Sequence, residues 1–88
     1  MEKSLISEEY RLFLAFLKKV RQDKGVTQER IAKKLKATQS FVSKVERGER
    51  RLDVVELRRW SRALGLSLPD FVSGFEDYLK KEKHRAHS

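Results

Sequence analysis

The apolar positions of this chain recur every three or four residues in five stretches, which is the spacing of one side of an α-helix. No stretch alternates apolar and polar residues as a β-strand does. Each stretch follows a residue whose side-chain oxygen can accept a free backbone N–H at a helix N-terminus. We therefore predict an all-α fold of five helices, which begin after Ser7, Thr27, Thr38, Asp53 and Ser67.

The segment from Thr27 to Arg51 is the most informative, because its pattern describes two short helices joined by a tight turn. Apolar residues fall on one side of each helix: Ile31, Ala32 and Leu35 in the first, Val42 and Val45 in the second. The other side of the second helix carries short hydrogen-bonding groups and cations: Gln39, Ser40, Ser43, Lys44 and Arg47. These groups are suited to contacts with the edges of DNA bases.

The positive charge gathers around the same segment. The chain has a formal net charge of +8 from 21 Lys or Arg and 13 Asp or Glu. Residues 18–62 hold 15 of these cations and 6 of these acids, a local excess of +9, whereas the charged residues within 63–79 are all acidic. Single cations often do no more than solvate a helix, but a local excess of this size favours a polyanionic partner.

Composition argues against several other classes. The 88 residues make one small domain, the chain has no Cys, and both histidines lie near the C-terminus, at His84 and His87. No apolar run reaches the roughly 20 residues that span a bilayer. We expect a soluble, cytoplasmic protein that is not an enzyme, with no cofactor, no metal, no small-molecule substrate and no membrane partner. We expect a domain over 1–79, with the two-helix motif at 27–48, and a basic, disordered tail over 80–88.

Residues 17–68 resemble the helix-turn-helix domain of the XRE family, also called Cro/CI-type or lambda-repressor-like. The resemblance rests on Leu17, Val20, Arg21, Lys24-Gly25-Val26-Thr27-Gln28, Ile31-Ala32, Thr38-Gln39, the run Val42-Ser43-Lys44-Val45-Glu46-Arg47-Gly48, and Ala63-Leu64-Gly65-Leu66. It implies a compact five-helix domain with the helix-turn-helix at the second and third helices. It also implies that residues 39–47 form a recognition helix in the major groove of DNA.

The resemblance gives individual residues roles. Arg21 and Glu46 resemble the family's internal ion pair, which we favour over the alternative that Arg21 contacts a phosphate. Gln28, at the start of its helix, is expected to hold a phosphate together with backbone N–H groups. Lys36 stands in the turn where the family usually has Gly, in a backbone conformation that costs a residue with a side chain roughly 1 kcal/mol. Its side chain is expected to point outward, where it adds a phosphate contact.

The expected base contacts come from the recognition helix. Gln39 can form a bidentate pair with adenine, and Ser40 and Ser43 are permissive partners. Lys44 suits either guanine or a phosphate. Phe41 suits either the core or a thymine methyl group. The expected contacts to the DNA backbone come from three arginines that follow the helix: Arg47, Arg50 and Arg51. The alternative is that one of the three enters a minor groove.

The fifth helix has a longer apolar stripe than a small core needs. We expect its outer part to form a two-fold dimer interface, made by Phe75, Tyr78 and Leu79. Alternatively, Tyr10, Phe13 and Phe16 of the first helix cover the whole stripe within one chain. The sequence thus predicts a homodimeric, sequence-specific transcriptional regulator of the repressor type that binds a near-palindromic site in double-stranded DNA. An antitoxin-like or other protein-interaction module, which would use the same stripe to bind a protein partner, is the alternative.

Overall fold

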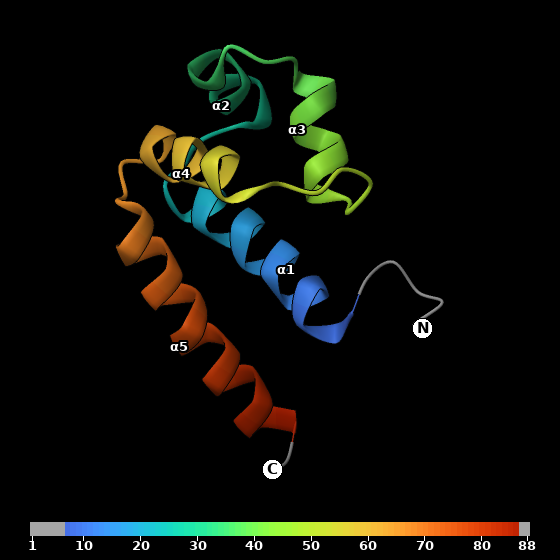
Figure 1. Cartoon of the computed structure of the whole chain (residues 1–88), viewed down its shortest axis with the longest axis vertical. Helices are drawn as coiled ribbons and strands as arrows, with labels where there is room; N and C mark the ends of the chain where they lie inside the picture. The colour runs from blue at the N-terminus through green and yellow to red at the C-terminus, as the bar shows by residue number, and fades with distance from the viewer. Residues whose placement is uncertain (1–6, 87–88) are drawn as a thin grey trace.

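The structure is a computed structural model that describes residues 7–86, with side chains as far as Lys83. This part of the chain is all-α, as predicted, and contains five helices (Figure 1). They are α1 (Glu8–Asp23), α2 (Gln28–Leu35), α3 (Gln39–Glu46), α4 (Val54–Ala63) and α5 (Leu68–Ala86). The helix-turn-helix lies at α2 and α3.

The five helices begin where the sequence predicts, because each predicted cap accepts a backbone N–H from three residues further on. The oxygen-to-nitrogen distances are 3.1 Å at Ser7 and Thr27, 3.0 Å at Thr38, 2.7 Å at Asp53 and 3.2 Å at Ser67. At α4 the cap is reciprocal, since the Glu56 side chain accepts the Asp53 backbone N–H at 2.9 Å. The polar residues between the apolar stretches therefore determine where each helix starts.

The helices pack around one core. α2 and α3 lie together at one end of the molecule, and α5 reaches towards the other end (Figure 1). α3 packs on α1 and α2, and α4 packs on α2 and α5. The largest fully buried apolar side chains come from all five helices: Leu17, Ile31, Val42, Val45, Trp60 and Phe71. Ala32 is also buried, at the packed interface of α2 and α3, so its small side chain matters for their close approach.

Two features refine the sequence predictions. Lys36 ends α2 with a φ of 56°, the left-handed conformation that glycine usually supplies. α5 continues through Ala86, so residues 80–86 are helical, although we predicted a disordered tail from residue 80. The run of Lys and Glu has good helix propensity, and Lys83 lies 3.5 Å from Glu9 of α1, nitrogen to oxygen. The predictions for residues 1–6 and 87–88 lie outside the described residues.

Among residues 7–86, no helix combines the length and the apolar composition needed to cross a membrane.

Candidate nucleic-acid interface

α3 presents a buried side and a polar side. Val42 and Val45 are completely buried, which fixes the helix against α1 and α2. On the opposite side Gln39, Ser40 and Lys44 are exposed, and Ser43 is half-buried. The structure therefore places the four residues predicted to contact bases on one short helix, three of them exposed.

Phe41 packs against the core, which is one of the two roles that the sequence allowed, and its contact with a thymine methyl group stays a prediction. Its half-buried ring packs against the core, and the Arg50 guanidinium lies over the ring, 5.2 Å from its centroid. This cation–π contact connects the recognition helix to the loop that follows it. The sequence contained no signal for it beyond the nearness of a basic and an aromatic residue.

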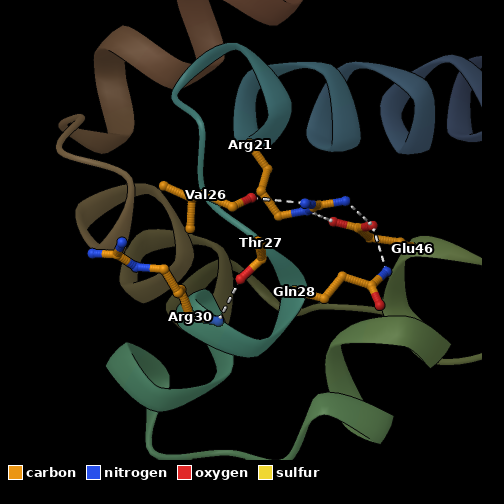
Figure 2. Close-up of polar contacts among 6 residues, drawn as sticks. All are labelled: Arg21, Val26, Thr27, Gln28, Arg30 and Glu46. Carbon is orange, nitrogen blue, oxygen red and sulfur yellow. Dashed lines mark hydrogen bonds and ion pairs between the residues drawn. The ribbon is translucent and has the colours of Figure 1, made fainter.

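The Arg21–Glu46 ion pair predicted from the sequence is present (Figure 2). Arg21 Nε donates to Glu46 Oε2 at 2.6 Å and Nη2 donates to Oε1 at 3.1 Å, while Nη1 donates to the Val26 carbonyl at 2.7 Å. The two side chains are only 8% and 3% exposed. A buried, bidentate pair of this kind fixes the direction of both side chains, so the end of α3 is held against α1.

Gln28 joins the same network, which sequence reasoning missed. Its Nε2 donates to Glu46 Oε1 at 2.9 Å, so α1, α2 and α3 meet at one carboxylate (Figure 2). The side chain predicted to hold a phosphate is thus already oriented. One amide N–H and the free backbone N–H groups at the start of α2 remain to meet a ligand.

Two of the arginines predicted to contact phosphates have carboxylate partners. Arg47 donates to Glu49 at 2.9 Å and also contacts the Ser43 hydroxyl. Arg50 Nη2 donates to Glu56 Oε2 at 2.5 Å. These hydrogen bonds raise the pKa of each arginine and lower the pKa of its glutamate; at Glu56 the backbone N–H of Asp53 lowers it further. Phosphates would therefore compete with Glu49 and Glu56.

Arg51 contacts a different aromatic ring from its neighbour Arg50. Its guanidinium lies over the Tyr10 ring, 4.1 Å from the centroid, which ties the loop after α3 to the start of α1. Lys36, by contrast, is exposed in the turn between α2 and α3. Along the sequence, two of the predicted phosphate contacts, Gln28 and Lys36, precede α3, and the three arginines follow it.

The apolar stripe of α5 is partly covered by α1, as the alternative reading of the sequence allowed. The Phe75 ring lies 5.5 Å from that of Phe13, and the Tyr78 ring lies 5.3 Å from that of Phe16, centroid to centroid. Leu79 is only 8% exposed, whereas Phe75 and Tyr78 are half-buried. Their place in a dimer interface stays a prediction.

Other apolar side chains are more exposed. Val54 and Val55 at the start of α4 are 66% and 55% exposed, and Val72 of α5 is 42% exposed. Val72 lines an open hollow of about 400 Å³ between α1, the loop before α4, and α5. The hollow is lined mainly by aromatic and aliphatic side chains, which include Tyr10, Phe13, Leu52, Leu57 and Phe75. Within the described part of the chain, no three His, Cys, Asp or Glu residues gather as a metal site would require.

Comparison with known proteins gives consistent matches. The helix-turn-helix family model matches residues 17–71. An uncharacterized HTH-type transcriptional regulator of Bacillus subtilis (strain 168), YqaF, is 32% identical over 71 residues, which cover 81% of this chain and 90% of YqaF.

Solved structures agree. An XRE-family like protein from Pseudomonas syringae pv. tomato str. DC3000 is 39% identical with a TM-score of 0.72, over 78% of this chain and 84% of that protein. The restriction-modification controller protein C.Esp1396I, solved as a tetramer in complex with its natural 35-base-pair operator, is 28% identical with a TM-score of 0.74, over 82% of this chain and 95% of that protein. This chain therefore belongs to the XRE family of helix-turn-helix, DNA-binding transcriptional regulators.

Proposed function

We propose that this protein binds a near-palindromic operator in double-stranded DNA as a homodimer, with α3 in the major groove, and acts as a repressor. The observation that carries the proposal is the construction of α3. One side of the helix is fully buried, its C-terminal end is fixed by the buried Arg21–Glu46 pair, and its solvent side presents Gln39, Ser40 and Lys44. Short polar side chains on a rigid helix can distinguish bases with little conformational cost.

The proposal divides the α3 side chains by chemistry. Gln39, at the first helical position, pairs with adenine, and Lys44, one turn further on than Ser40, donates to guanine O6 and N7 or to a phosphate. Ser40 and Ser43 accept or donate single hydrogen bonds. The Ser43 hydroxyl contacts the Arg47 side chain, so the hydrogen bond that Ser43 makes with a base depends on the position of Arg47.

Contacts to phosphates come from the residues around α3. Gln28 uses its remaining amide N–H together with the N-terminal backbone of α2, and Lys36 approaches from the turn. Arg47, Arg50 and Arg51 contact the backbone beyond the recognition helix. Because Glu49 and Glu56 hold two of these arginines in the free protein, DNA binding exchanges a carboxylate for a phosphate at each. This exchange reduces the net gain in affinity while keeping the arginines ordered.

Dimerisation supplies the second half-site. Two copies related by a two-fold axis would place their recognition helices about 34 Å apart, one turn of DNA. The assembly of C.Esp1396I as a tetramer on its operator supports oligomeric binding. We propose that the interface uses the exposed valines, Val54 and Val55 of α4 and Val72 of α5, which we call the valine surface, together with Phe75, which lines the same hollow as Val72. Tyr78 and Leu79, which the sequence also suggested, have less free area to contribute.

The same valine surface is the feature that favours the alternative, an antitoxin-like or other module that binds a different protein. Both functions would cover Val72, but only the dimer would do so in the purified protein. The mass of the purified protein therefore distinguishes them. As a DNA-binding regulator, the protein would act in the cytoplasm.

The direct test is selection of bound duplexes from a random pool, followed by footprinting of the enriched sequence. We expect a half-site that occurs twice with two-fold symmetry. Recovery of duplexes with no common sequence would contradict sequence-specific binding, and a single unrepeated half-site would contradict the dimer.

A further inference from the structure

A basic hollow lies on the side of α2 and α4, apart from the exposed edge of α3. It has a volume of about 520 Å³ and is lined by five cations and two apolar residues: Lys34, Lys36, Arg58, Arg59, Arg62, Leu35 and Ala63. All five cationic residues are exposed, and no acidic residue lines the hollow. The proposed DNA contacts use only Lys36 among these residues, so the other four have no role yet.

The cations of the basic hollow lack the close ion pairs that hold Arg21, Arg47 and Arg50, although the charge of Arg59 helps to lower the pKa of Glu56. Arg21, Arg47 and Arg50 each form an ion pair. In the described part of the chain, none of the five cations that line the hollow lies within ion-pair distance of an acid. Lys34 donates instead to the Ala63 carbonyl at 3.4 Å, across the contact between α2 and α4.

Helix dipoles account for part of this pattern. Lys34 and Arg62 stand in the last turns of α2 and α4, where a cation complements the partial negative charge of the helix end. Arg58 and Arg59 stand in the middle of α4, where this effect has faded. Their gathering beside three further cations repels in the free protein, and a bound polyanion would relieve the repulsion.

The chemistry of the basic hollow fits a DNA backbone. Three of its five cations are arginines, whose planar guanidinium groups bind phosphate oxygens in pairs. The five cations line one open hollow and come from α2, the turn after it and α4, which suits a ligand whose charges recur along a strand. A single small anion would leave most of them unmatched.

The basic hollow has no residue of α3 in its lining. Gln28 begins α2 and Lys34 is six residues further on, a displacement of about 9 Å along the helix. Arg58 and Arg62 lie one turn apart on α4 and extend the surface further. Lys36, at the turn before α3, is the point where the hollow meets the proposed recognition surface.

We propose that the basic hollow binds the phosphate backbone of a second DNA segment, one that α3 does not read. The proposal rests on the proposed function, because α3 must hold the first segment. A protein with both surfaces would connect an operator to neighbouring DNA without reading the sequence of the second segment.

The test is capture of a second duplex. Biotinylated operator, in excess over the protein so that α3 is occupied, is fixed to beads, and a fluorescent duplex of unrelated sequence is added. We expect the parent protein to retain the fluorescent duplex and the Arg58→Gln/Arg62→Gln variant to retain about tenfold less at low salt. Operator affinity of the variant should stay within about twofold of the parent, since neither arginine contacts that segment.

Lys80→Gln/Lys81→Gln is the matched control, because it removes two exposed charges from α5. It should capture the second duplex as the parent does. Two results would overturn the proposal: no capture by the operator-bound parent protein, or equal losses of capture in both variants. If the parent captures no second duplex, an acidic protein is the alternative partner of the hollow.

A second measurement separates failure of the basic hollow from failure of the proposed function. Lys44→Glu weakens base contacts by placing an acid on the exposed side of α3, and the change that Arg58→Gln/Arg62→Gln then makes in the remaining affinity for a random duplex reports on the hollow. Adding Arg58→Gln/Arg62→Gln should reduce the salt slope of this remaining binding by about two units. This result would stand even if the selection found no operator, whereas an unchanged slope would contradict a phosphate contact in the hollow.

Discussion

Gln28 and Glu46, 18 positions apart in the sequence, share a hydrogen bond of 2.9 Å from Nε2 to Oε1. Glu46 also accepts two hydrogen bonds from Arg21. One carboxylate therefore positions both the start of α2, where a phosphate contact is proposed, and the end of the recognition helix. The hydrogen-bond network at Glu46 therefore helps to fix the distance between these two contact regions.

Glu46→Ala should be strongly destabilising. It leaves the Arg21 guanidinium buried without a counter-charge, and removal of one partner from a buried pair costs about 3–5 kcal/mol. Urea unfolding followed by circular dichroism measures the loss. Glu49→Ala is the control, because its exposed pair with Arg47 should contribute no more than about 1 kcal/mol. Equal losses in the two variants would show that the buried pair has no special structural role.

Gln39→Ala and Lys36→Gln should affect DNA binding in different ways. Gln39 is proposed to contact one base, so its removal should reduce the preference at that base pair by about 1–3 kcal/mol. Lys36 is proposed to contact a phosphate, so its neutral variant should weaken binding to all sequences alike and reduce the salt slope by about one unit. Titrations of the selected operator and of single-base variants, at several salt concentrations, distinguish the two. Similar losses of specificity would contradict this division of roles.

The fold could be predicted from the sequence because it depends on local signals. The caps at Thr27, Thr38 and Asp53 and the apolar spacing between them are each readable within a few residues. The end of α5 was missed because a Lys- and Glu-rich run resembles a frayed tail as closely as a solvated helix.

The candidate site could be predicted only for residues that belong to the family pattern. That pattern indicated the Arg21–Glu46 pair and the polar residues of α3. The pattern did not predict three other contacts: the hydrogen bond from Gln28 to Glu46, and the positions of Arg50 over Phe41 and Arg51 over Tyr10. These contacts join residues from different elements and depend on the directions of their side chains, which the sequence does not show. The exposure of Val72 was likewise unreadable, since a helical stripe does not show which of its members a neighbouring helix covers.

Glu56 should make the protein less stable in acid. Hydrogen bonds from Arg50 and from the Asp53 backbone lower its pKa in the folded state below the ordinary value of about 4.3. The stabilisation is therefore complete above the ordinary pKa and is lost as the pH falls through the lowered folded pKa. Glu56→Gln keeps the acceptor for the capping box but has no charge to titrate, so its unfolding free energy should fall less with decreasing pH in this range. Arg50→Gln should flatten the dependence as well, and curves parallel to that of the parent would contradict the assignment.

The valine surface predicts a specific change in assembly. Val72→Glu places a charge where two copies would meet, and burial of an unpaired carboxylate is costly enough to separate them. Sedimentation equilibrium should then give the mass of one chain, whereas the parent gives that of two. Ala15→Glu, on an exposed position of α1, is the matched control and should leave the dimer intact. Tyr78→Ala tests the other end of the stripe: a dimer that survives Val72→Glu but not Tyr78→Ala would move the interface to the C-terminal half of α5, and a parent protein of single-chain mass would remove the dimer altogether.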